Sequence, residues 1–202
     1  MPFDTPSSTS DRPHVVIVGA GFAGLEAAKT LRDAPVRVTL VDRNNYHKFQ
    51  PLLYEVAMAG LEPDDIAHNV RNIFQGNETV NFRLGTVVDI DPARQQVHLH
   101  GSQSLSYDHL ILAAGAVSTD FGIPGPAEHA YPLKNVPAAL NLRNRALRQL
   151  ERYDPPRAGA GDGALTFSLR RGWPPGVAPA GAFVELSVPL HYSFAPFYTR
   201  QA

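Results

Sequence analysis

One short segment near the N-terminus, His14 to Val18 (HVVIV), restricts the fold of this chain more than any other feature. A run that is apolar throughout, without alternation, is typical of a strand buried on both faces of a parallel sheet. A glycine-rich loop follows at once, and apolar residues then recur at helical spacing until a second apolar run, Arg37 to Val41, ends at Asp42. A strand, a helix and a second strand in this order form a β-α-β unit. The sequence therefore predicts an α/β domain with a parallel sheet.

The loop after the first strand has the spacing G-x-G-x-x-G. Gly19 permits the tight turn from strand to helix, Gly21 lets the backbone approach a pyrophosphate, and Gly24 lets the helix and strand pack closely. The N–H groups at the start of the helix attract phosphates, and the carboxylate of Asp42 can accept hydrogen bonds from ribose hydroxyls. We interpret the segment as a dinucleotide-binding loop. The alternatives are a glycine-rich turn that binds nothing and an Asp42 that only ends its strand.

Further elements are expected along the chain. Pro63 followed by two acidic residues is typical of a helix start, because proline fits the first turn and acids favour the positive end of the helix dipole. In chain order we expect a helix, three strands of an antiparallel meander, a buried strand and an amphipathic helix, over residues 63–74, 81–90, 95–100, 105–107, 109–114 and 136–153.

Composition excludes several kinds of chemistry. The chain has no cysteine, which rules out disulfides, thiolate metal sites and thiol nucleophiles within it. His98 and His100 share one strand face, but a metal site needs more ligands, so no metal is expected. A net charge of −1 gives no indication of nucleic-acid binding. No apolar run reaches the roughly 18 residues of a membrane span, and the polar N-terminus lacks the core of a signal peptide, so we expect a cytoplasmic protein without a transmembrane segment.

Two longer segments resemble known flavoproteins. Residues 109–125 (HLILAAGAVSTDFGIPG) resemble the A-T-G segment of two-dinucleotide flavoproteins, which favours FAD over NAD at the first site. Residues 44–67 (NNYHKFQPLLYEVAMAGLEPDDIA) are similar to the segment after the first β-α-β unit of type II NADH dehydrogenases. These single-subunit enzymes pass electrons from NADH through FAD to a membrane quinone. Arg71 and residues 85–91 (GTVVDID) fit the same family in the same order.

The resemblance implies a Rossmann-like FAD-binding domain and places the cofactor on particular residues. The glycine loop would hold the FAD pyrophosphate, Asp42 its AMP ribose, and the backbone of Val87 its adenine. Gln50 and Pro51 would lie near the isoalloxazine, and the segment after the strand 109–114 would pass beside the cofactor. The complete set of expected cofactor-binding residues is Gly19, Ala20, Gly21, Phe22, Ala23, Gly24, Asp42, Arg43, Gln50, Pro51, Val87, Ala114 and Gly115.

The resemblance also implies the reaction, which is hydride transfer from NADH to flavin followed by electron transfer to a quinone. No side chain needs to act as a nucleophile or metal ligand, because the cofactor carries the chemistry. Glu55 is interpreted either as a residue that tunes the flavin or as a solvent-facing acid, and His47 as a loop histidine. The region Asn44 to Glu55 has no cysteine, so a flavin-to-disulfide relay is excluded. A ferredoxin- or rubredoxin-reductase-like flavoprotein remains an alternative.

The second glycine loop of the family, which would bind NADH, has no intact counterpart here. Residues 168–182 (SLRRGWPPGVAPAGA) stand in its place, with Arg171 and Trp173 where its first two glycines are needed. A one-base shift of the reading frame can restore V-G-G-G at residues 170–173. We therefore interpret residues 168–202 as scrambled by compensating frame slips, and a diverged second domain is the alternative.

The predicted organisation is a flexible tail over residues 1–12, the N-terminal segment of an FAD-binding domain over 13–118, and an incomplete NAD(P)H-binding domain over 119–202. We expect this chain to bind FAD weakly and not to oxidise NADH alone. A stand-alone FAD- or nucleotide-binding module without turnover is the alternative. Full-length relatives would be peripheral at the cytoplasmic face of the membrane. The sequence leaves open the electron acceptor, the choice between NADH and NADPH, and the oligomeric state.

Overall fold

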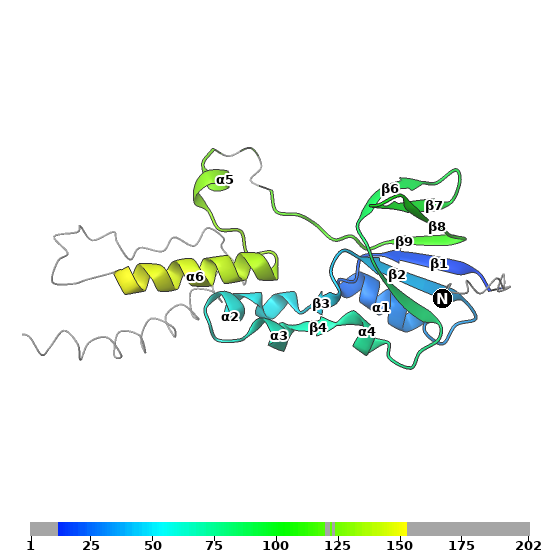
Figure 1. The fold of residues 1–202 in the computed structure, drawn as a ribbon, viewed down its shortest axis with the longest axis horizontal. Helices are drawn as coiled ribbons and strands as arrows, with labels where there is room; N and C mark the ends of the chain where they lie inside the picture. Colours follow the sequence, from blue (N-terminus) through cyan, green and yellow to red (C-terminus); the bar gives the residue numbers. More distant parts are fainter. Residues whose placement is uncertain (1–11, 120–121, 123, 153–202) are drawn as a thin grey trace, which may run out of the picture. The chain divides into compact units, whose positions relative to one another are not determined.

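A computed structural model describes residues 12–119, 122 and 124–152 of the chain (Figure 1). The chain divides into two compact units, one formed by Met1–Lys48 with Ala67–Ala116 and the other by Phe49–Ile66 with Val117–Ala202. Residues 1–11 of the expected tail and the whole expected scrambled segment 168–202 lie outside the described residues.

The first unit is built on a four-stranded sheet in the order β5-β2-β1-β9. Each strand is parallel to its neighbours, and the strands are β1 (His14–Val18), β2 (Arg37–Asp42), β5 (Val80–Leu84) and β9 (His109–Leu112). Helix α1 (Phe22–Leu31) connects β1 to β2. The chain builds the sheet outward from β1 and then returns to place β9 on the other side of β1. This reversal is the switch point of a doubly wound, Rossmann-like sheet, so the predicted fold class is confirmed.

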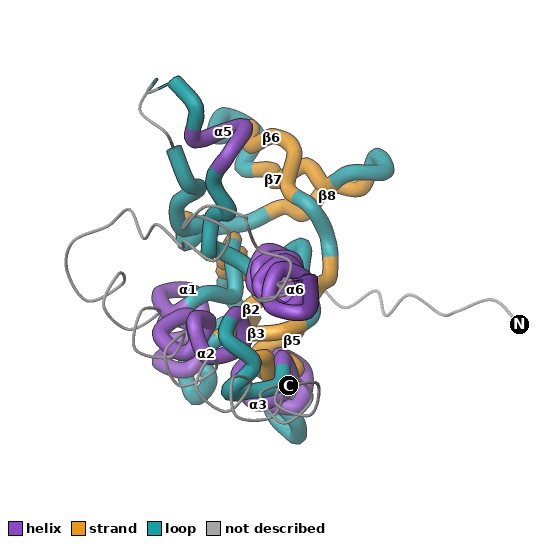
Figure 2. Tube along the Cα trace, turned by 90° about the vertical axis from the view of Figure 1, so that its left-hand side faces the viewer, coloured by secondary structure: helices purple, strands orange, loops and turns teal. Residues whose placement is uncertain are grey.

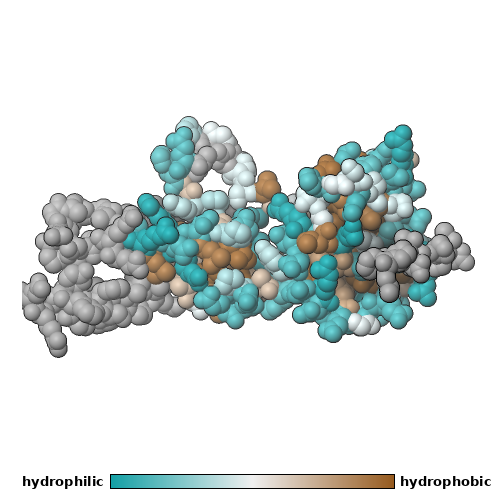
Figure 3. All heavy atoms as spheres, viewed as in Figure 1, coloured by the Kyte–Doolittle hydropathy of each residue, from teal (hydrophilic) through white to brown (hydrophobic). Residues whose placement is uncertain are grey.

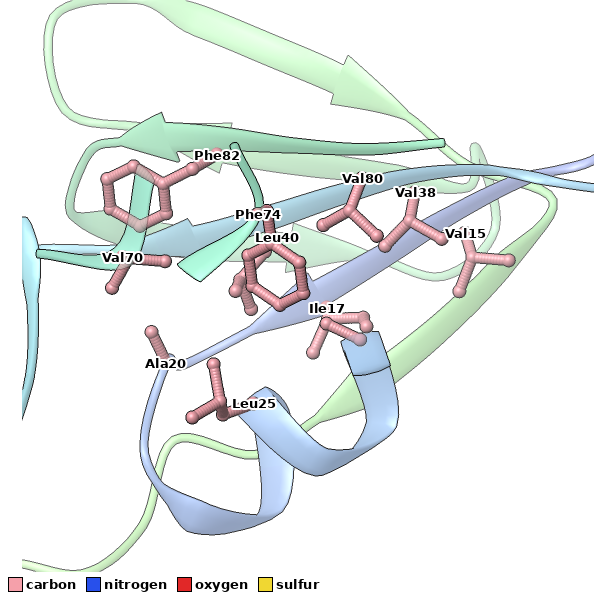
Figure 4. Packing of buried hydrophobic residues seen from close by; sticks show 11 residues of the cluster. Val15, Ile17, Ala20, Leu25, Val38, Leu40, Val70, Phe74, Val80 and Phe82 are labelled. Carbon is pink, nitrogen blue, oxygen red and sulfur yellow. The ribbon is translucent and has the colours of Figure 1, made fainter. Parts of the chain in front are cut away.

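The continuous apolar character of β1 follows from its position between two apolar layers. Val15 and Ile17 belong to the cluster that contains residues of α1 and of α4 (Val70–Ile73), whereas Val16 and Val18 belong to a second cluster. All five residues of β1 are buried. Figure 4 shows the first cluster, in which Leu25 of α1 lies against the strand side chains.

An antiparallel three-stranded sheet supplies the second apolar layer. Its strands are β6 (Val87–Asp91), β7 (Gln96–Leu99) and β8 (Gln103–Ser106), which form one group in Figure 2. The meander was predicted, but its first strand, expected over 81–90, is wrong in part because residues 81–84 belong to β5 of the parallel sheet. Phe82 is buried while Asn81 and Arg83 are exposed. An edge strand with one open face shows the same alternation as an antiparallel strand, which explains the error.

A short ribbon of β3 (Tyr46–Lys48) and β4 (Ala67–Asn69) completes the first unit. The single helix expected over 63–74 is therefore wrong, since α3 (Pro63–Ile66) and α4 are separated by β4. Pro63 does begin a helix, but β4 depends on pairing with β3, a partner that the local sequence does not reveal. Asn69 then caps α4 by accepting a hydrogen bond of 2.9 Å from the N–H of Arg71.

The second unit is helical in its described residues. Besides α3, it contains the 3₁₀ helix η1 (Gln50–Leu52) and the helices α2 (Leu53–Ala57), α5 (Pro126–His129) and α6 (Val136–Arg152). The amphipathic helix expected over 136–153 is confirmed as α6. Its residue Ala139 is fully buried in a cluster with Leu53 and Val56 of α2. Arg143 of α6 also forms an ion pair of 3.4 Å with Glu62.

The coloured surface in Figure 3 is largely hydrophilic, and smaller apolar areas lie among the hydrophilic residues. Among the described residues, the exposed large apolar side chains come from both units and are Phe22, Phe49, Leu84, Val88, Leu112, Val117 and Tyr131. Within the part of the chain that the structure describes, no helix is both long and apolar enough to cross a membrane.

Candidate nucleotide-binding site

The glycine loop lies at the carboxyl end of β1, beside the switch point of the sheet. Gly19 adopts φ +104°, a left-handed conformation that favours glycine, and a Cβ there would collide with the carbonyl oxygen of Ala113. A Cβ on Gly24 would collide in the same way with the carbonyl oxygen of Gly19. The N–H of Gly19 donates to the carbonyl of Val41 at 2.7 Å. Two of the three glycines are thus required by the packing of the protein itself, as the sequence predicted.

Gly21 differs from the other two glycines because nothing in the described structure requires it. Its φ is −71°, which any residue adopts, and an added Cβ would meet no atom within 4 Å. Gly21 is also the N-cap of α1, whose first turn has neither a side-chain cap nor an acidic residue. Because the amino end of a helix carries partial positive charge, open space at this point suits an anion.

Asp42 ties the end of β2 to the loop. One carboxylate oxygen, Oδ2, accepts the N–H of Ala20 at 2.7 Å. The other, Oδ1, accepts the backbone N–H of Asn44 at 2.7 Å and its side-chain amide at 3.2 Å. A carboxylate offers about four acceptor sites, so Oδ2 retains one for a ligand hydroxyl. Arg43 follows with an exposed side chain.

The segment that follows β9 runs next to the glycine loop. The N–H of Ala113 donates to the carbonyl of Val18 at 2.8 Å, which holds this segment against the end of β1. Ala114 and Gly115 come next, both exposed, and Gly115 adopts φ +73°. The structure therefore brings Ala114 and Gly115 into the same region of the first unit as the loop.

The remaining expected residues are placed differently. Val87 begins β6, half-buried and opposite Leu99, next to an irregularity of the strand register. Ala20 is buried, whereas Phe22 and Ala23 at the start of α1 are exposed. Gln50 and Pro51 form part of η1 in the second unit, so their position beside a cofactor stays a prediction.

Sequence reasoning missed His47 as a part of this site. Its interpretation as a loop histidine is wrong, because His47 is the central residue of β3 and only 7% exposed. Its Nδ1 lies 2.9 Å from the carbonyl oxygen of Ala20 in the glycine loop. The only signal in the sequence was its position within the 44–67 segment, since a contact between residues 27 positions apart leaves no local pattern.

The doubly wound sheet and its glycine loop define the class of dinucleotide-binding, Rossmann-like folds, and comparison with known proteins gives the family. The chain belongs to the pyridine nucleotide-disulphide oxidoreductase family, whose model matches residues 13–153. It is 40% identical over 193 residues to a type II NADH:quinone oxidoreductase of Mycobacterium tuberculosis, covering 92% of this chain and 41% of the relative. A second such protein of that organism is also 40% identical, over 186 residues. These relatives confirm the resemblance seen in the sequence.

Solved structures agree with this assignment. The structure of NDH2 from Plasmodium falciparum in complex with NADH superposes with a TM-score of 0.62 and 26% identity, covering 69% of this chain and 30% of that chain. A putidaredoxin reductase in complex with putidaredoxin gives a TM-score of 0.56, also at 26% identity, and covers 66% of this chain and 34% of that chain. The chain spans about two fifths of the length of the curated relatives that it matches at 40% identity.

Proposed function

We propose that this chain binds FAD at the glycine loop, as part of an oxidoreductase that passes a hydride from NADH to flavin and electrons on to a quinone. The observation that carries the proposal is Gly21. The protein packing demands Gly19 and Gly24 but not Gly21, which borders open space at the amino end of α1. A close approach of a pyrophosphate to the backbone explains a glycine there.

The residues of the first unit fit this cofactor. The loop would hold the pyrophosphate with backbone N–H groups, and the remaining acceptor site of Asp42 would take a ribose hydroxyl. The backbone of Val87 would meet the adenine, and Ala114 and Gly115 would pass alongside. For Gln50 and Pro51, which belong to the second unit, a place near the isoalloxazine rests on the family resemblance alone. FAD, when bound, supplies the acceptance of hydride and the onward transfer of electrons, whereas these residues bind and orient it.

The proposed substrates rest on the relatives. Type II NADH:quinone oxidoreductases at 40% identity favour NADH as the hydride donor and a quinone as the acceptor. The fold is shared with reductases of protein electron carriers, such as the putidaredoxin reductase, so a protein acceptor is the second candidate. We favour the quinone because the identity to its reductases is higher. We further propose a cytoplasmic location for this chain, and peripheral membrane association for full-length members of the family.

A titration of the purified chain with FAD, followed by flavin fluorescence anisotropy, tests the cofactor proposal. We expect wild-type chain to bind FAD and Gly21→Ala to bind it about tenfold or more weakly, because the added methyl occupies the space of the pyrophosphate. Thermal unfolding of Gly21→Ala is the control, since φ −71° suits alanine and the added methyl meets no protein atom, so this variant should be as stable as wild type. Absence of FAD binding, or equal binding by Gly21→Ala and wild type, would overturn the proposal.

A further inference from the structure

The peptide groups on both sides of Ala20 are held by side chains from two other segments. The N–H of Ala20 donates to Asp42 Oδ2 at 2.7 Å, and its carbonyl oxygen lies 2.9 Å from Nδ1 of His47. Ala20 is only 2% exposed. Asp42, which makes the first of these contacts, is the last residue of β2 and the expected ribose-binding acid. The second comes from the β3–β4 ribbon, whose residues have no part in the dinucleotide motif.

The contact fixes the tautomer of His47. A carbonyl oxygen only accepts hydrogen bonds, so Nδ1 must be the protonated nitrogen of the ring. The ring of Phe22, within the same loop, meets the His47 ring edge-on, with centroids 5.2 Å apart and planes at 86°. His47 therefore contacts the loop at two points, one polar and one apolar. Its own place is set by the ribbon, in which His47 is paired with His68.

The Ala20 carbonyl belongs to the same planar group as the N–H of Gly21. The described residues contain no cis peptide bond, so this N–H points away from the carbonyl and hence away from His47. No acceptor among the described residues takes the N–H of Gly21. An oriented donor without a partner, next to the open space at Gly21, suits a phosphate oxygen.

We propose that His47 is a positioning residue of the dinucleotide loop, whose Nδ1–H holds the Ala20–Gly21 peptide so that the Gly21 N–H is directed at the FAD pyrophosphate. The inference rests on the proposed function for the identity of the ligand. The hydrogen bond from His47 Nδ1 to the Ala20 carbonyl, which we call the clamp, forms without FAD. His47 does not react with the cofactor. It fixes a donor in advance, which reduces the ordering that binding would otherwise require.

Three variants separate the hydrogen bond from packing. Asparagine carries its amide nitrogen at the position of Nδ1, so His47→Asn can keep the bond, whereas His47→Gln places the nitrogen one carbon further out. His47→Phe keeps an aromatic ring against Phe22 and removes the donor. We expect His47→Asn to bind FAD within about threefold of wild type, and the other two variants to bind about tenfold more weakly. Equal affinities in all three variants, whether weakened or not, would overturn the proposal.

Two measurements on the FAD-free chain test the clamp independently. Nitrogen NMR shifts of the neutral His47 ring should show the hydrogen on Nδ1, and a hydrogen on Nε2 would overturn the clamp. The carbonyl carbon of Ala20 should have the same NMR shift in wild type and His47→Asn and a different shift in His47→Phe, which removes the donor to its oxygen, and equal shifts in all three proteins would also overturn the clamp. If no variant and no wild-type chain binds FAD, the proposed function fails, and these two measurements still decide whether His47 positions the loop. Thermal unfolding verifies that each variant is folded.

Discussion

At the scale of single residues, Gly21 and Gly24 are constrained for different reasons, and this difference can be measured. Helix propensity alone would favour alanine over Gly24 in α1 by about 1 kcal/mol. A Cβ there collides with the backbone of Gly19, and an overpacked site costs about 1–3 kcal/mol. The cost less the gain leads us to expect that Gly24→Ala lowers the free energy of unfolding in urea by up to about 2 kcal/mol. Gly21→Ala should leave that free energy unchanged, and an equal loss in both variants would contradict the distinction.

The buried His14 should make the free energy of unfolding depend on pH. Burial, followed by repulsion from the Arg37 guanidinium, lowers the pKa of His14 below its ordinary value of 6.5. Below pH 6.5 the unfolded chain then takes up a proton that the folded chain does not, so stability falls as the pH drops through this value. Urea unfolding between neutral pH and pH 5 should show this loss, and His14→Gln should reduce it. Gln can keep a bond to the hydroxyl of Thr39, which lies 2.8 Å from His14 Nε2. An unchanged pH dependence in this variant would contradict the assignment.

At the scale of elements, the second unit is stabilised by the contact between α2 and α6. Ala139 of α6 is fully buried, in a cluster with Leu53 and Val56 of α2. A leucine in its place should overpack this contact and lower the free energy of unfolding by about 1–3 kcal/mol. Asn144→Leu is the matched control, because it adds the same side chain at an exposed position of α6. Equal effects of the two variants on urea unfolding would show that α6 does not pack as described.

Elements that depend on local pattern could be predicted, and those that depend on distant pairing could not. The apolar run of β1, the glycine spacing and the periodicity of α6 each lie within one short stretch of sequence. The ribbon of β3 and β4 forms between segments about 20 residues apart, so the sequence indicated a helix where β4 lies. The same non-local pairing places His47 against the glycine loop, which is why its contact with Ala20 could not be predicted.

At the scale of the whole molecule, the proposed FAD site of the first unit would supply one of the two nucleotide sites that the proposed reaction needs. Hydride transfer requires the nicotinamide to lie about 3–3.5 Å from the flavin in an aligned geometry, which calls for a second nucleotide site. Arg171 and Trp173 stand where the glycines of that site are needed, in a segment outside the described residues. The chain also spans only about two fifths of the length of its curated relatives. We infer that binding of FAD and turnover of NADH are separable in this chain.

The separation predicts that the chain loaded with FAD is not reduced by NADH. Under anaerobic conditions the visible absorption of the bound flavin should persist after NADH is added, and a soluble quinone should not be consumed. Dithionite, which reduces flavin directly, should bleach the same sample and thereby show that the cofactor is accessible to reduction. Bleaching by NADH at a rate well above that of free FAD would contradict the prediction. It would also mean that residues 168–202 do position a nicotinamide, and that the interpretation of this segment as scrambled is wrong.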